Sequence, residues 1–214
     1  MERILRPLKS ILALLFILSF FAGNTAIAKM SQSQGVVSTK KIPAPVISKK
    51  IVRLNVPHIR QKRDLCVPTS SAMILKYYGE KHDPTALKKL AENYKPKSKR
   101  NKTFTYWRDM RYALKKVGKN WPIKNYRNTS QGFRSGLNDI KRSLRGGRPV
   151  MIDVHLGPGH TFVVMGFNDI DKVVYIRDPN ISGSRSRVLT YKQLQASWNN
   201  HRFSNSRSAF FSRK

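Results

Sequence analysis

The spacing of apolar residues changes once along the chain, from a helical to an extended period. Up to residue 144 apolar positions recur every three or four residues, which predicts amphipathic helices. After residue 148 they form short runs rich in β-branched and aromatic residues, which predicts strands. The predicted helices cover 67–78, 84–94, 106–117 and 131–144, and the predicted strands cover 149–154, 161–167 and 173–176. Helices first and antiparallel strands second indicate an α+β fold with two unlike halves.

Shorter signals complete this prediction. A strand is predicted at 51–56, where alternating residues end at Pro57. Thr190 and Gln193 have the spacing of a capping box, which predicts a short helix through Trp198. A last strand is predicted at 208–212.

The first 28 residues have the pattern of a secretory signal peptide. Arg3, Arg6 and Lys9 precede an apolar run at 11–21, and Ala26-Ile27-Ala28 is an A-x-A cleavage site. An uncleaved anchor is the alternative. We expect an exported protein, periplasmic or secreted, with a flexible linker at 29–50 and one domain at 51–214.

The chain has a large excess of basic over acidic residues. The chain has 42 Lys and Arg against 11 Asp and Glu, a net charge of +31. Such a charge attracts anionic partners, and for an exported protein an envelope polymer or a membrane surface is expected. Specific nucleic-acid binding is not expected, because no binding motif organises the basic residues. The basic stretch 95–102 is interpreted as a solvated loop, with contact to an anionic surface as the alternative.

The chain has a single cysteine, Cys66, directly before the first predicted helix. Exported proteins use cysteines mostly in pairs, so an unpaired thiol is a candidate reactive group. The positive end of a helix dipole favours the nucleophilic thiolate. Gln61, five residues upstream, can donate its side-chain amide to an oxyanion. The alternatives for Cys66 are a small buried apolar residue and an intermolecular disulfide.

A cysteine nucleophile needs a base and a group that orients the base. His160 begins an apolar strand and Asp178 follows the next one. A turn centred near Asp169 places the two opposite each other, and a register slip of two residues keeps them neighbours.

Two other interpretations use the same region. His155, with Asp153 two residues before it, is an alternative base. Both residues together with His160 could bind zinc, but nothing else has ligand spacing, so we expect neither a metal nor a cofactor.

Three segments resemble a known family: VPHIRQKRDLCVPTSSAMILKYYG, GHTFVVMGF and VVYIRDP. They are similar to papain-like cysteine peptidases of the bacteriocin-processing (double-glycine leader peptidase) type, including stand-alone exported relatives. The resemblance covers roughly residues 54–198. It departs from the family at Val67, where the family usually has glycine directly after the cysteine.

The resemblance implies a papain-like fold and a protein or peptide substrate. It implies Cys66 as nucleophile, His160 as general base and then acid, and Asp178 as the orienting residue. Gln61 and the Cys66 backbone N–H would stabilise the oxyanion. The alternatives are an inactive papain-like domain that binds anionic polymers, and a thiol transglutaminase, deamidase or amidase on the same scaffold.

Overall fold

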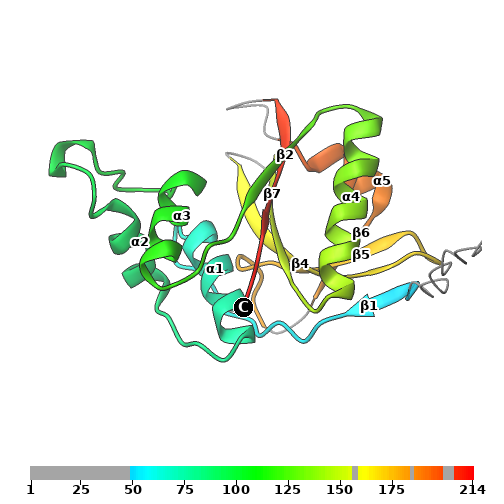
Figure 1. Cartoon of the computed structure of the whole chain (residues 1–214), viewed down its shortest axis with the longest axis horizontal. Coiled ribbons are helices and arrows are strands. Elements are labelled where there is room, and N and C mark those ends of the chain that lie inside the picture. The colour runs from blue at the N-terminus through cyan, green and yellow to red at the C-terminus, as the bar shows by residue number, and fades with distance from the viewer. Residues whose placement is uncertain (1–48, 156–158, 184–185, 200–204) are drawn as a thin grey trace, which may run out of the picture. The chain divides into compact units, whose positions relative to one another are not determined.

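The computed structural model describes residues 49–155, 159–183, 186–199 and 205–214 (Figure 1). These belong to the unit formed by residues 45–214. The predicted signal peptide at 1–28 and nearly all of the predicted linker at 29–50 lie outside the described residues. The helices are α1 (Cys66–Tyr77), α2 (Pro84–Glu92), α3 (Trp107–Lys116), α4 (Ser130–Arg145) and α5 (Tyr191–Ser197), with a 3₁₀ turn at Lys97–Lys99. The strands are β1 (Ile51–Arg53), β2 (Ile123–Arg127), β3 (Val150–Val154), β4 (His160–Asn168), β5 (Val173–Arg177), β6 (Arg187–Thr190) and β7 (Ser206–Phe211).

The strands form one antiparallel sheet in the order β2-β7-β3-β4-β5-β6. Strand β1 pairs with the second half of β4, beyond the part that β3 covers. The predicted α+β class is confirmed. Two strands were not predicted, β2 and β6. Three of the five residues of β2 and two of the four residues of β6 are exposed, so neither strand contains a long apolar run.

The β4–β5 hairpin has a different register from the predicted one. At its open end Val163 pairs with Arg177 and Val164 with Ile176, a shift of two residues from the predicted pairing. The turn is later than predicted because it spans 169–172, where Lys172 has a φ of 52°. The shift still leaves the start of β4 and the end of β5 side by side.

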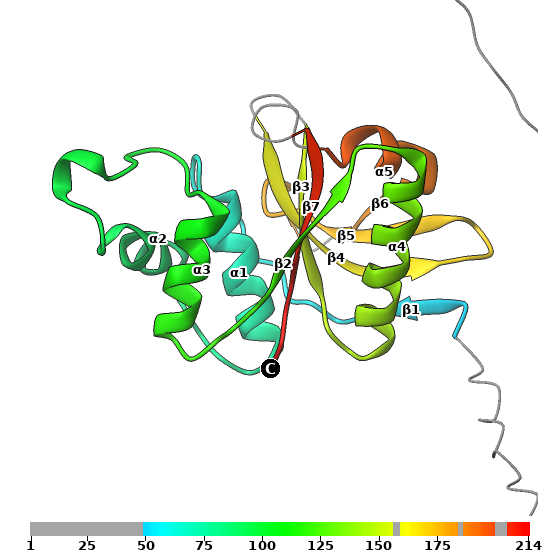
Figure 2. The ribbon, with the colours of Figure 1, turned by 45° about the horizontal axis from the view of Figure 1, so that its top comes forward.

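Each face of the sheet has its own core, as the alternation of side chains along a strand requires. On one face Ile152 and Val164 pack with Leu137 and Ile140 of α4. On the other face Met151 and Val163 pack with α1 and α3. Figure 2 shows α1, α2 and α3 together on one side of the sheet strands, and α4 and α5 on the other.

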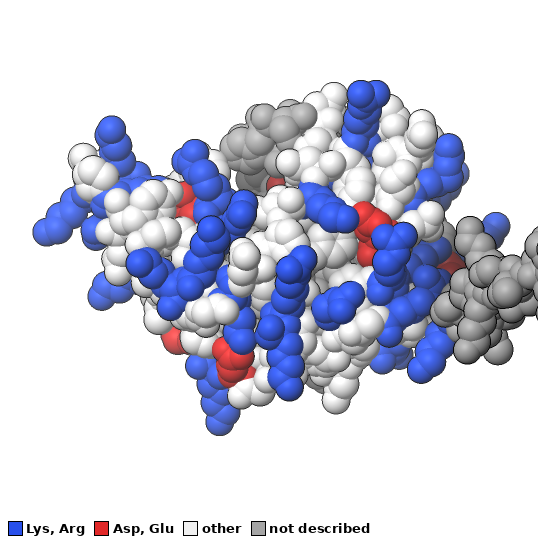
Figure 3. All heavy atoms as spheres, viewed as in Figure 1, with Lys and Arg blue, Asp and Glu red and all other residues white. Residues whose placement is uncertain are grey.

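Basic side chains are spread over the visible surface rather than gathered at one point (Figure 3). Acidic side chains are few and mostly lie beside basic ones. The expected anionic partner stays a prediction. None of the helices in the described part of the chain is long and apolar enough to cross a membrane.

Candidate active site

Cys66 is the first residue of α1, and its position is fixed by the helix behind it. Residues Val67 to Leu75 are all buried, with Ala72 to Leu75 fully inaccessible to solvent. Leu65, the N-cap residue, makes no side-chain capping hydrogen bond. The Cys66 side chain therefore lies at the N-terminal end of a firmly packed helix.

His160 and Asp178 meet at the open end of the β4–β5 hairpin. His160 Nε2 lies 2.7 Å from Asp178 Oδ1, so the ring donates a hydrogen bond to the carboxylate. Asp178 is almost fully buried. Its Oδ1 also accepts the Asn180 backbone N–H at 2.9 Å, and its Oδ2 lies 3.5 Å from the Arg187 guanidinium. These contacts hold the carboxylate in place and satisfy its charge.

The ionisation of this pair is set by competing effects. Burial disfavours a charged imidazole, but the hydrogen bonds to Asp178 and Cys66 outweigh it and raise the pKa of His160 to about 9. Burial likewise acts to raise the pKa of Asp178, yet His160 and the other donors hold that pKa below its usual value. At neutral pH His160 is therefore a cation between an Asp178 carboxylate and the Cys66 side chain.

Gln61 lies in the loop that leads into α1. Its backbone N–H donates to the Pro179 carbonyl at 2.8 Å, and His58 Nε2 lies 3.1 Å from the Asp178 carbonyl. The loop is thereby tied to the residues around Asp178. The Gln61 side chain lines the same cleft as Cys66. Its Oε1 is buried without a hydrogen-bond partner among the described residues, so this oxygen takes no part in a structural network.

These side chains share a cleft of about 1150 Å³. One wall is the segment 104–108 at the start of α3, with Phe104 and Tyr106 partly exposed. The floor comes from the sheet strands β2, β3, β4 and β7. Cys66, His160, Asp178 and Gln61, the four residues singled out in the sequence, all line this cleft.

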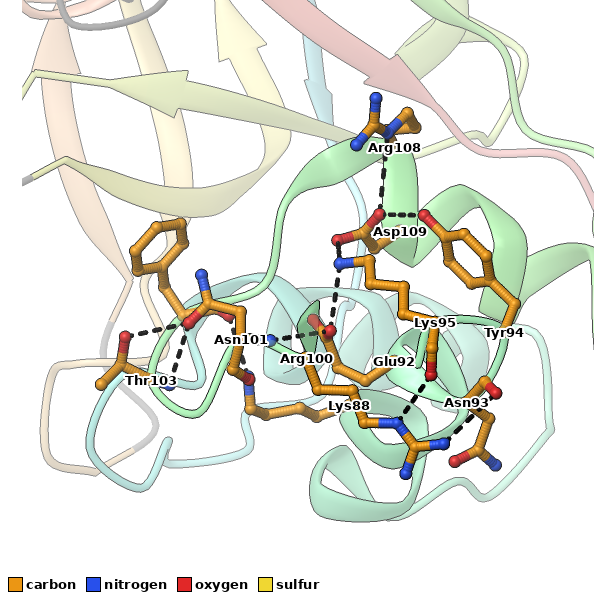
Figure 4. A network of polar contacts seen from close by, with 11 residues as sticks. Lys88, Glu92, Asn93, Tyr94, Lys95, Arg100, Asn101, Thr103, Arg108 and Asp109 are labelled. Carbon is orange, nitrogen blue, oxygen red and sulfur yellow. Dashed lines mark hydrogen bonds and ion pairs between the residues drawn. The ribbon is translucent and has the colours of Figure 1, made fainter. Parts of the chain in front are cut away.

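The wall is held by a polar network between α2 and α3 (Figure 4). Asp109 is completely buried and accepts a hydrogen bond from Tyr94 at 2.5 Å. It also pairs with Lys95, which reaches Glu92 at 3.0 Å. Lys88 donates to the carbonyls of Asn101 and Phe104 at 3.1 and 2.8 Å. The segment 95–102 is therefore attached at several points, and the interpretation of it as a merely solvated loop was wrong for Lys95.

The alternative site at His155 is not formed as predicted. His155 follows β3, and its backbone N–H donates to the Ser197 carbonyl at 2.8 Å. His155 is not among the residues that line the cleft, whereas Asp153 is. In the described part of the chain no three His, Cys, Asp or Glu side chains are placed to hold a metal ion.

Several residues of the cleft had no signal in the sequence. Arg187 lies beyond a stretch of serines and arginines that showed no pattern, and Asn180 follows Asp178-Pro179 without a motif of its own. Trp107 reached the cleft only because α3 packs beside β4, where its Nε1 donates to Thr161 Oγ1 at 3.1 Å. Contacts of this kind depend on the packing of distant segments.

Known proteins show the same architecture. Among solved structures, the chain is similar to the peptidase domain of Streptococcus ComA, a bi-functional ABC transporter involved in quorum sensing, with a TM-score of 0.52 and 21% identity over 74% of this chain and 99% of that chain. It is also similar to a double glycine motif protease from an AMS/PCAT transporter in complex with the leader peptide, with a TM-score of 0.52 and 20% identity over 76% and 95% of the two chains. At these identities the likeness concerns the fold alone. No curated protein matches the sequence significantly.

A family model settles the classification that the fold and the suspected resemblance indicated. The model of the Peptidase_C39 like family matches residues 53–206, which is well over half of the chain. The match includes the loop before α1, α1 itself and the whole β4–β5 hairpin. This chain therefore belongs to the Peptidase_C39 like family, a family of papain-like cysteine peptidases.

Proposed function

We propose that this protein hydrolyses peptide bonds with Cys66 as the nucleophile. The observation that carries the proposal is the 2.7 Å hydrogen bond from His160 to the buried Asp178 carboxylate. The same imidazole is hydrogen-bonded to the Cys66 side chain at the start of α1. An imidazolium beside a thiol at a helix N-terminus stabilises the thiolate, which is the form that attacks carbonyl groups.

The chemistry then runs in two steps. The Cys66 thiolate attacks the scissile carbonyl carbon, and the oxyanion takes hydrogen bonds from the Gln61 amide and the Cys66 backbone N–H. His160 gives its proton to the leaving amine, which leaves an acyl-enzyme. Neutral His160 next takes a proton from water, the water attacks the thioester and the thiolate is released. Asp178 orients the ring and stabilises its cationic form throughout.

Val67 is compatible with this role. It is the second residue of α1, and its side chain is only 5% exposed in the core between α1 and the sheet. A helical backbone is accessible to a β-branched residue, which loses mainly side-chain freedom there. Val67 is therefore accommodated in the helical backbone next to Cys66, and it also contributes to the lining of the cleft.

The proposed substrate is a peptide or protein outside the cytoplasm. The solved double glycine motif protease was crystallised with a leader peptide, which supports a peptide substrate for a related cleft. Export is proposed from the pattern of residues 1–28. In an exported chain, where cysteines mostly occur in pairs, the unpaired Cys66 thiol is a candidate reactive group.

The decisive experiment is the pH dependence of Cys66 alkylation by iodoacetamide, in the mature protein and in His160→Ala. We expect wild-type alkylation to persist below pH 6, because the imidazolium retains its proton up to about pH 9. In His160→Ala the rate should rise only near the ordinary thiol pKa of about 8.5. A wild-type profile that rises near pH 8.5 and ignores His160 would overturn the proposal.

A second experiment separates hydrolysis from the other functions of this scaffold. A peptide library is incubated with the wild type, with Cys66→Ala and with alkylated protein, and new termini are identified by mass spectrometry. A peptidase produces new amino termini only with a free Cys66. A deamidase or transglutaminase would change side-chain masses instead, and a binding module would keep its ligand after alkylation.

A further inference from the structure

A row of polar side chains crosses the floor of the cleft, beside the proposed catalytic residues. Asn125 of β2 is paired with Ser208 of β7, and Asp153 of β3 is paired with Thr161 of β4. Strands β3 and β7 are paired up to Ile152 and Ala209, so the next position along places Asp153 beside Ser208. All four side chains line the cleft. They form a continuous row over four neighbouring strands.

The row interrupts a face that is otherwise apolar. Met151, two residues before Asp153 on the same strand, is fully buried in the core with α1 and α3. Phe210 occupies the corresponding position on β7, two residues after Ser208. Side chains two residues apart lie on the same face of a strand, so the face changes from apolar to polar within one repeat.

Asp153 differs from the other members of the row in its side-chain contacts with the described residues. Ser208 Oγ lies 2.8 Å from Asn125 Oδ1, and Thr161 Oγ1 accepts the Trp107 Nε1 hydrogen at 3.1 Å. Within the described residues, Asp153 takes part in no hydrogen bond or ion pair of its side chain. The Asp153 carboxyl is half-buried in the cleft. A carboxylate that has lost part of its hydration gains from a ligand that donates a hydrogen bond to it.

The electrostatics of the site favour the binding of a cation beside the Asp153 carboxyl. Burial raises the pKa of Asp153 to about 7, and the positive charge of His160 only partly opposes this rise. A second cation against the carboxyl would favour its ionised form and form a charge-assisted hydrogen bond in a water-poor cleft. His160 acts on Asp153 only through its charge, because the ring is hydrogen-bonded to Asp178 and Cys66.

We propose that Asp153 is a specificity-determining residue that binds a lysine or arginine side chain of the peptide substrate. The proposal rests on the proposed peptidase function, since it assigns a substrate class to the same cleft. The polar row supplies further acceptors around the cation, at Asn125 and Thr161. The net charge of +31 repels cationic peptides at long range, so a preference for lysine would have to arise inside the cleft.

The test is a binding experiment that does not depend on turnover. In a Cys66→Ala background, six hexapeptides each carry one lysine at a different position, and six twins carry norleucine, which has a similar chain length and no charge. Fluorescence anisotropy gives the Kd of each pair. We expect one position at which lysine binds at least about tenfold more tightly than norleucine, and Asp153→Asn should remove that difference.

Two further variants keep the test falsifiable. Asp64→Asn is the matched control, because Asp64 also lines the cleft but is 46% exposed and lies 3.7 Å from Arg63. Its φ of 61° is one that asparagine adopts readily, so the preference should stay unchanged. Asp153→Glu keeps the charge, and it should retain a preference for lysine even if Asp153→Asn folds poorly.

The outcomes separate this inference from the proposed function. Equal binding of lysine and norleucine at every position, or a preference that persists in Asp153→Asn, would overturn the assignment of Asp153 while leaving Cys66 chemistry untouched. Failure of the peptidase itself would show as a loss of low-pH alkylation in the wild type.

Discussion

The two faces of the central sheet differ in what their side chains do at the strand ends. On the face that packs against α4 and α5, the apolar rows continue across the strands and end on Trp198, which is fully buried. On the face toward α1 and α3, apolar rows give way to Asp153 and Thr161, and the cleft opens above them. One face is closed by packing, and the other is left open where substrate chemistry needs room.

The hairpin β4–β5 repeats this contrast along its own length. At the turn, Asp169 accepts hydrogen bonds from Tyr191 and Lys141, which belong to the closed side. At the open end, Asp178 holds His160 in the cleft. Both aspartates have a pKa held below the usual value by their donors. The same residue type therefore stabilises the fold at one end and orients a proposed general base at the other.

The largest expected effect is that of Asp178→Asn on turnover. An amide leaves the shape of the site nearly unchanged but no longer stabilises the His160 cation, so kcat/KM should fall by roughly 10³-fold or more. Asp169→Asn is the matched control at the other end of the hairpin and should leave kcat/KM within about threefold. Similar losses in both variants would mean that Asp178 acts only through the fold.

Trp198→Ala tests the closed face. The indole contacts Tyr126 and Phe133 at centroid distances of 5.9 and 6.3 Å, and its Nε1 donates to the Ser208 carbonyl at 2.8 Å. Its removal should lower the free energy of unfolding by about 3–5 kcal/mol. Urea unfolding measures this loss, and the folded fraction should keep the low-pH Cys66 alkylation of the wild type. Lost alkylation in folded protein would contradict the division between the faces.

Asp109→Asn tests the wall of the open face. The change removes the charge that the buried Lys95 pairs with, which should cost about 3 kcal/mol of stability. Because segment 104–108 lines the cleft, KM should rise more than kcat falls. Arg108→Gln is the control: Arg108 also neighbours Asp109, at 3.7 Å, but is 84% exposed and should change stability by less than about 0.5 kcal/mol.

The smallest effect is expected for Asp153→Asn. This variant should gain stability, whereas the two preceding variants should lose it. The pKa of Asp153 lies near 7 in the fold against 3.8 in a free side chain, so ionisation opposes folding as pH rises through this window. The variant should therefore be more stable than the wild type above pH 7, by about 2 kcal/mol after allowance for the carboxyl's partial exposure. The difference should vanish below pH 4. Urea unfolding at pH 8 and below pH 4 measures the stability of both proteins. A variant less stable than the wild type at pH 8 would show that Asp153 has an internal partner.

The sequence predicted the helices well because each has a complete local signal. Asp83 caps α2 through the Ala86 N–H, followed by Pro84 at the first helical position, as their order in the chain indicates. The capping box of Thr190 and Gln193 is formed as predicted. The edge strand β2 was missed because a strand that exposes most residues needs no apolar alternation.

For the site, Cys66, His160 and Asp178 could be singled out because each stands at the end of an element with a strong pattern, and Gln61 because it lies five residues before Cys66. The structure shows that all four line one cleft. The hairpin register was wrong by two residues, since turn length depends on whether Lys172 adopts a positive φ. That choice depends on the packing around the turn and not on the residue alone.

The sequence by itself determined the α+β class, the positions of the helices to within two residues, and the identity of the one thiol. These features follow from local spacing and from residue counts. Only the tertiary structure decided that Asn180 and Arg187 hold Asp178, that Lys95 is buried against Asp109, and that Asp153 lines the cleft. The reason is physical: burial and charge pairing depend on which distant segments meet, and a one-residue change of strand register moves a side chain from one face of the sheet to the other.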